Sequence, residues 1–168
     1  PVIAQKGKKG FRCTVRGLAG HSAYAPLGVN AVEFAAEAVA FLKQMARRHR
    51  DRGPYDRGFD IAHTTVHTGV IRGGSALNVI PHECAFDFEF RHLPGDDPDR
   101  LLSEFRDYIA TRLEPEMHLT HPAAGFTIEE WREPELPAAC PERGEAAQRA
   151  VSPSRRGQRA VLVVRAQR

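Results

Sequence analysis

The chain has 168 residues, 42% of them hydrophobic and 27% charged, which is the balance of one ordinary globular domain with room for a short appendage. Its formal net charge of +3 arises from 24 basic and 21 acidic residues mixed along the chain, a pattern that argues against a nucleic-acid partner. No apolar run approaches the roughly 20 residues of a membrane span, no signal peptide is visible, and three widely spaced cysteines predict reduced thiols in a cytoplasmic protein.

The first part of the chain predicts one strand and one helix. Apolar and polar residues alternate over 11–16, so we expect a half-buried strand there whose apolar face begins at Phe11. A loop rich in glycine and proline follows, and Asn30 is a suitable N-cap for a helix over 31–48. That helix is apolar over a wide arc, which indicates cover on two sides, by its own sheet and by a partner chain.

The next part predicts two strands, a helix and a fourth strand. A β-branched segment over 60–71 ends at two glycines, and strict alternation over 84–91 indicates a second half-buried strand. Asp97 followed by proline is a typical helix start, and an apolar stripe extends the predicted helix over 98–113. The segment 126–131 is the last predicted strand.

The resulting order, β-α-β-β-α-β, predicts an α+β ferredoxin-like sandwich. In this fold a four-stranded antiparallel sheet carries both helices on one face, and the strand over 60–71 lies at a sheet edge. Three phenylalanines of one parity are expected under the helices, whereas charged residues of the other parity line the open face. The first group is Phe86, Phe88 and Phe90, and the second is Arg12, Arg16, Asp87, Glu89 and Arg91.

The composition changes after Glu133. The remaining 35 residues hold seven arginines, four prolines and no lysine, with little apolar periodicity. We therefore predict one domain over 1–133 and an irregular tail over 134–168, the product of a truncated or frameshifted gene or of an excised domain.

Residue types alone suggest few catalytic sites. His63 and His67 have the spacing of a helical metal pair, but on the predicted strand their rings would lie about 13 Å apart, too far to share one ion. His21 lies in a loop of small residues and is placed to donate a hydrogen bond outward. Asn78 and Arg91 offer an amide and a guanidinium, although a turn at Asn78 and pairing of Arg91 with a neighbouring carboxylate are the simpler interpretation.

Four pieces in this order resemble the dimerisation (lid) domain of the M20 family of zinc-dependent aminoacylases and peptidases. They are G-x-x-x-H-S at 17–22, Asn-Ala-Val at 30–32, the run from Gly-Gly to Pro over 73–81, and the strand end with its proline-glycine turn over 88–98. The last two pieces, together with Gly-Pro-Tyr-Asp at 53–56, resemble the acetylornithine deacetylase branch most. The resemblance covers about residues 1–133, and Leu77 stands where the family sometimes carries a second asparagine.

The resemblance implies a role for each of these side chains. His21 would be the catalytic residue, donating a hydrogen bond to the oxyanion in the active site of the partner subunit. Asn78 and Arg91 would bind an N-acyl amino acid, with Arg91 on its α-carboxylate. The full-length parent would hold zinc or cobalt in a catalytic domain, whereas this chain carries no metal ligands, needs no cofactor of its own, and is expected to be inactive alone.

The resemblance also implies a partner, and two alternatives to an enzyme part remain. We expect a homodimer through the helix over 31–48 and the edge strand over 60–71, whose pairing would form one eight-stranded sheet. An RNA-binding module shares the predicted topology, but the aromatic residues over 84–91 face the helices and Asp87 and Glu89 repel phosphate. A stand-alone oligomerisation module without a catalytic role is the other alternative.

Overall fold

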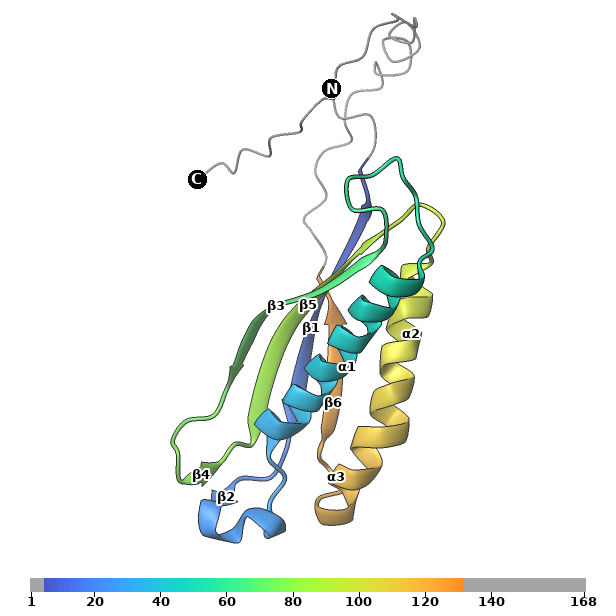
Figure 1. The fold of residues 1–168 in the computed structure, drawn as a ribbon. Coiled ribbons are helices and arrows are strands. Elements are labelled where there is room, and N and C mark those ends of the chain that lie inside the picture. The colour runs from blue at the N-terminus through green and yellow to red at the C-terminus, as the bar shows by residue number, and fades with distance from the viewer. Residues whose placement is uncertain (1–4, 132–168) are drawn as a thin grey trace, which may run out of the picture. The chain divides into compact units, whose positions relative to one another are not determined.

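The computed structural model describes residues 5–131, and Figure 1 shows their arrangement. The predicted tail over 134–168, and with it the domain boundary after residue 133, lies outside the described residues and stays a prediction. No helix in the described part of the chain is long and apolar enough to cross a membrane.

The elements follow the predicted order, with several short additions. The strands are β1 (Gly7–Arg16), β2 (Gly20–His21), β3 (Thr65–Gly73), β4 (Val79–Ile80), β5 (Glu83–His92) and β6 (Gly125–Glu130). The helices are the 3₁₀ segment η1 (Ser22–Leu27), α1 (Ala31–Arg52), α2 (Pro98–Tyr108), the π-helical turn η2 (Ile109–Leu113) and α3 (Glu114–Thr120).

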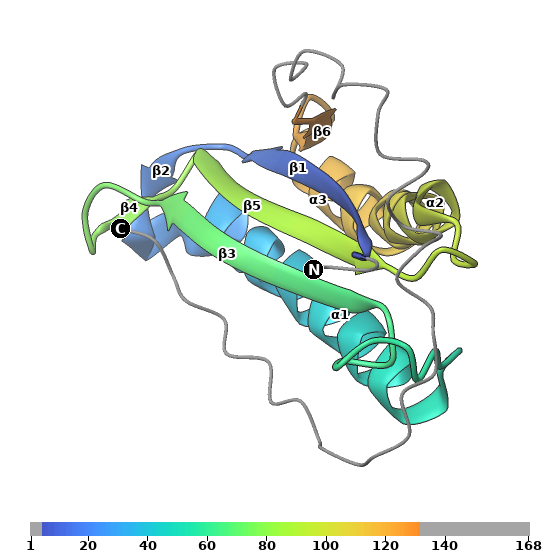
Figure 2. The same ribbon diagram turned by 90° about the horizontal axis from the view of Figure 1, so that it is seen from above.

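Four strands form one sheet in the order β3-β5-β1-β6, and every neighbouring pair is antiparallel. The helices lie together on one face of this sheet (Figure 2). This arrangement confirms the predicted α+β sandwich and leaves β3 at one edge. The short strands β2 and β4 form a separate two-stranded sheet at one end of the domain (Figure 1).

Both predicted N-caps are confirmed. The Asn30 side chain accepts hydrogen bonds from the backbone N–H groups of Val32 and Glu33, and Asp97 accepts one from the N–H of Asp99. These bonds satisfy donors that have no partner within the helix, which explains why α1 and α2 begin where the sequence indicates.

Several predicted element bounds were wrong: β1 begins four residues before the predicted strand, α1 ends four residues after the predicted helix, and two larger differences have clear structural causes. The second main strand begins at Thr65, not at 60, because the buried Thr64 hydroxyl binds the Asp96 carboxylate and accepts the backbone N–H of Leu93 at 3.0 Å, outside the ladder. His63 therefore lies in the loop before β3 and not on a strand. The second helix does not end at 113, because the π-helical turn η2 leads directly into α3.

The core lies between the sheet and the helices, as the alternation predicted. Phe88 stacks on Phe11 at 5.1 Å between ring centroids, and its edge meets Phe105 of α2 at 5.2 Å. Burying each such ring contributes about 1.5–3 kcal/mol to stability. The buried side chains of α1 include three alanines, which let this helix approach the sheet closely; the full α1 set is Ala31, Ala35, Ala38, Leu42, Met45 and His49.

Candidate functional site

The small sheet joins the two loops that the sequence had singled out separately. His21 pairs with Val79 in the β2–β4 ladder, and the N–H of Ser22 donates to the backbone oxygen of Asn78 at 3.0 Å. The N–H of Ala31 donates to the Pro81 oxygen at 2.9 Å, which fixes the start of α1 to the same loop. His21 and Asn78, 57 positions apart in the chain, are thereby held side by side at one end of the domain, here called the tip.

The His21 ring is held by its own loop. Its Nδ1 accepts a hydrogen bond from the backbone N–H of Ala23 at 3.1 Å, as the N-cap of η1. A neutral imidazole has one donor and one acceptor nitrogen, so this bond leaves the proton on Nε2. The side chain is exposed, and Nε2 is therefore available as a hydrogen-bond donor to a group outside the domain.

The backbone of Asn78 forms part of a turn, whereas its side-chain amide makes no hydrogen bond within residues 5–131. The N–H of Val79 donates to the Ala76 oxygen at 3.2 Å, which closes a turn with Leu77 and Asn78 at its corners. Among residues 5–131 the Asn78 side chain has no hydrogen-bond partner, and it is exposed. The predicted turn role is correct, and the amide remains free to bind a ligand.

Arg91 is not brought to the tip. It lies on β5 opposite Thr65 and Lys8, at the far end of the main sheet, and its Nε donates to Glu89 Oε1 at 2.9 Å. It lies eight residue steps along the strand from Glu83, where β5 begins beside the tip, a distance of about 26 Å. Within one chain Arg91 therefore lies on the open face, in the simple ion pair that the residues alone suggested.

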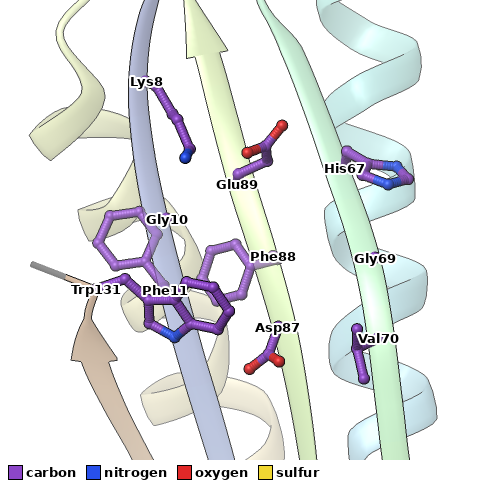
Figure 3. Close-up of a pocket in the computed structure, with 10 residues that line it drawn as sticks. All are labelled: Lys8, Gly10, Phe11, His67, Gly69, Val70, Asp87, Phe88, Glu89 and Trp131. Atoms are coloured by element: carbon purple, nitrogen blue, oxygen red, sulfur yellow. The ribbon is translucent and has the colours of Figure 1, made fainter. Parts of the chain in front are cut away.

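A groove of about 290 Å³ crosses the open face, which sequence reasoning missed (Figure 3). Gly10 lines the groove without a side chain; it is opposite Glu89 in the β1–β5 ladder, and its backbone oxygen accepts the N–H of Trp131 at 2.8 Å. Asp87 in the groove accepts two hydrogen bonds from Arg12, at 2.9 and 3.1 Å, and the Arg12 guanidinium lies 5.8 Å from the Trp131 ring centroid. Arg12 compensates the charge of Asp87, and His67 and Glu89 also line the groove, which is therefore a mixed polar and aromatic surface.

A second feature missed by the sequence is a buried histidine at the far end from the tip. His49 in the last turn of α1 is only 8% exposed, and neither ring nitrogen has a hydrogen-bond partner. It borders a cavity of about 460 Å³ beside the start of α2. Burial lowers the pKa of His49, because the charged imidazolium loses solvation; Asp96 opposes this effect.

The residues present do not fit a catalytic metal ion. No group of three or more histidine, cysteine, aspartate or glutamate side chains within residues 5–131 is arranged to hold one. The buried Cys13 thiol is also unsuited to metal binding, because burial raises its pKa to about 12 and disfavours the thiolate.

A family comparison covers most of the described domain, including the paired loops and the edge strand. The model of the peptidase dimerisation domain of the M20 family matches residues 3–117. The chain belongs to this family. The matched range covers β1 through most of α3 and includes His21, Asn78 and Arg91.

Two similar sequences belong to full-length enzymes. The domain is 43% identical over 101 residues to the acetylornithine deacetylase of Myxococcus xanthus, covering 60% of this chain and 26% of that protein. It is 32% identical over 115 residues to the acetylornithine deacetylase of Pasteurella multocida, covering 68% of this chain and 29% of that protein. The chain thus spans less than a third of the length of these relatives.

Similar solved structures support the fold of this M20 dimerisation domain. An amidase of the hydantoinase/carbamoylase family from Burkholderia multivorans superposes with a TM-score of 0.58 at 20% identity, over 76% of this chain and 28% of that chain. Aminopeptidase PepT from Bacillus cereus gives a TM-score of 0.52 at 20% identity, over 76% of this chain and 32% of that chain.

The dimerisation domain presents an apolar edge that suits its family name. Ile71 on β3 is 52% exposed, and Val70 beside it is also exposed. On the neighbouring helix α1, Val32 and Val39 are half-buried and Ala36 is exposed. β3 is the edge strand of the sheet, so its outer backbone groups have no strand partner among the described residues. Ile71 is opposite the core residue Phe86 and lies on the α1 side of the sheet, whereas Val70 is opposite Asp87 and lines the groove on the open face.

Proposed function

We propose that this chain is the lid and dimerisation part of an N-acyl-amino-acid amidohydrolase, and that its parent converts N-acetylornithine and water to ornithine and acetate. The family match and the identity to two acetylornithine deacetylases support this substrate. The observation that carries the proposal is the junction of His21 and Asn78 at the tip, which leaves an imidazole donor and an amide exposed together.

His21 is the proposed catalytic residue. When the amide carbonyl of the substrate is attacked, negative charge develops on its oxygen, and a donor already in place stabilises that charge. The Ala23 N–H bond fixes the His21 ring with its Nε2 proton outward, so little reorganisation is required. One such donor is worth about 3–4 kcal/mol of transition-state stabilisation. Asn78 beside it binds the substrate through its side-chain amide.

Arg91 joins this site through a dimer. If two β3 edges pair antiparallel about a two-fold axis, the start of one strand lies beside the end of its partner. Arg91 is opposite Thr65 at the start of β3, and Gly73 at its end leads into the loop of Asn78. The pairing therefore brings Arg91 of one chain toward the tip of the other. There the guanidinium exchanges Glu89 for the α-carboxylate of the substrate.

The proposed metal, zinc or cobalt, belongs to the part of the parent outside this chain, as does the general base. The described residues offer no fitting ligand set, so the chain's own contribution is to bind and orient the substrate and to donate to its oxygen. Elemental analysis of the purified chain is expected to give well below one zinc per chain. Added zinc or cobalt is expected to release no acetate from N-acetylornithine; chelator-sensitive release would contradict the lid assignment.

The shared site can be tested by mixing two inactive variants. A full-length acetylornithine deacetylase receives residues 5–131 of this chain in place of its own dimerisation domain and must dimerise and release acetate. His21→Ala and Arg91→Ala are then made separately, unfolded, mixed and refolded. Half of the dimers are mixed, and each mixed dimer has one intact site, so about a quarter of the unmutated activity is expected to return.

Three outcomes contradict the proposal. An exchanged enzyme that dimerises but releases no acetate shows that the domain does not serve this reaction. Full activity of the His21→Ala variant identifies a pure oligomerisation module. If each variant is inactive but mixing restores nothing, His21 and Arg91 do not serve one site from two chains.

A further inference from the structure

The tip differs in charge from the rest of the domain. The two segments that form it, 17–31 and 73–81, contain no aspartate, glutamate, lysine or arginine, although 27% of the whole chain is charged. Surfaces that become fully buried in an interface or active site are depleted of charge, because desolvating an unpaired charge is costly. The tip is therefore suited to burial during function.

Apolar side chains at the tip are exposed without serving the fold. Leu77 is fully exposed, and Tyr24 and Leu27 in η1 are more than half exposed. Leu77 occupies the first corner of the turn closed by the Val79–Ala76 hydrogen bond. Turn corners favour glycine, proline, asparagine, aspartate and serine, so neither the turn nor the core requires a leucine there.

The position of Leu77 in the turn places it near the expected position of the substrate's acyl group. Its Cα lies one peptide unit, about 3.8 Å, from that of Asn78, and the β2–β4 ladder places His21 opposite Val79, two positions further on. In the proposed function His21 donates to the carbonyl oxygen of the N-acyl group. The acyl substituent is bonded to that same carbonyl carbon and thus lies within reach of the residue next to Asn78.

We propose that Leu77 is a specificity-determining residue that contacts the N-acyl substituent of the substrate when the tip covers the active site. This inference rests on the proposed function and deepens it. An acetyl methyl group that packs on Leu77 leaves water, whereas a formyl group offers no carbon to pack. Leu77 therefore favours acetyl over formyl substrates, and by excluding water it also strengthens the hydrogen bond from His21.

The test compares two substrates in the exchanged full-length deacetylase. We expect Leu77→Asn to lower kcat/KM for N-acetylornithine about tenfold, and to leave kcat/KM for N-formylornithine within about twofold, because one methyl contact in an apolar site is worth about this factor. Leu77→Met restores an apolar contact of similar volume and is expected to keep the acetyl preference. Leu119→Asn on α3, where the leucine is 87% exposed, is the matched control and leaves the preference unchanged.

The outcomes separate this inference from the function on which it rests. His21→Ala is expected to lower kcat/KM for both substrates by the same factor. If it does so, but Leu77→Asn leaves the acetyl-to-formyl ratio unchanged or lowers both substrates equally, Leu77 does not contact the acyl group. If His21→Ala has no effect on either substrate, the proposed function itself is wrong.

Discussion

The two ends of this domain are built differently. The tip is uncharged, joined by backbone hydrogen bonds between two-residue strands, and exposes its donor His21. The far end carries ion pairs such as Arg91–Glu89, a part-buried Thr64–Asp96 hydrogen bond, and a buried histidine. The tip therefore leaves its polar side chains available to other molecules, whereas the polar groups of the far end bind one another within the domain.

Removal of the donor at the tip should have the largest effect. In the exchanged deacetylase we expect His21→Ala to lower kcat about 10²–10³-fold, since one donor to a developing oxyanion is lost. Unfolding free energy and dimerisation should be nearly unchanged, because the exposed ring only caps η1. Steady-state kinetics and sedimentation check both. A variant that fails to dimerise would place His21 in the interface and not in the active site.

A matched pair of glycine substitutions compares the two ends directly. A Cβ on Gly17 would lie 2.0 Å from the backbone oxygen of Val29, so the loop behind the tip must move. A Cβ on Gly95, in the turn at the far end, would meet nothing within 4 Å. We expect Gly17→Ala to reduce the free energy of unfolding by about 1–3 kcal/mol and to impair the tip.

Gly95→Ala is the control and should change the free energy of unfolding by less than about 0.5 kcal/mol. Urea denaturation measures both variants. Equal destabilisation by the two substitutions would mean that the tip is not the more tightly constrained backbone.

These features differ in how far the sequence reveals them. The alternation from Cys84 to Arg91 and the caps Asn30 and Asp97 are local patterns, so the strand, both helix starts and the sandwich could be predicted. The β2–β4 ladder could not, because two residues show no periodicity and their pairing depends on distant segments. The sequence indicated His21, Asn78 and Arg91 as separate candidates. It could not show that His21 and Asn78 lie together while Arg91 lies far from both, because that arrangement depends on tertiary structure.

Two errors have specific physical causes. The β-branched residues before Thr65 favour a strand, but a tertiary hydrogen bond from the buried Thr64 holds the chain outside the ladder. The predicted helix ended at Leu113, the last residue of its apolar stripe, but the π-helical turn η2 leads on into α3, where Pro115 lies in the first turn and needs no N–H partner. Neither the burial of His49 nor the groove beside Trp131 has a signal in the sequence.

The burial of His49 at the far end predicts that the free energy of unfolding depends on pH. The pKa of His49 is lowered by burial, whereas in the unfolded chain it lies near 6.5. The unfolded state therefore binds more protons below about pH 6.5, and the stability that is present above this pH is lost as the pH falls. The slope reaches at most about 1.4 kcal/mol per pH unit for one proton.

We expect His49→Phe to flatten the fall in unfolding free energy between pH 7 and pH 5, measured by urea denaturation at each pH. His67→Phe replaces an exposed histidine on β3 and serves as the control that keeps the slope of the unmutated chain. If His49→Phe retains the full slope, another group binds the proton.

The smallest expected effect concerns an ion pair that joins the two helices near the far end. Arg48 of α1 donates two hydrogen bonds of 2.6 Å to the Glu104 carboxylate of α2, with side chains 41% and 36% exposed. Water and salt screen a pair so exposed, and ordering both side chains costs entropy, so only its bidentate geometry favours a measurable contribution.

A double-mutant cycle with Arg48→Met and Glu104→Gln should give a coupling free energy of about 0.2–1 kcal/mol at low salt. At 1 M salt, where the Debye length is about 3 Å, the coupling should shrink. A coupling of several kcal/mol that persists in salt would mean that this pair is shielded from water by something other than residues 5–131, and the far end would then also be a contact surface, like the tip.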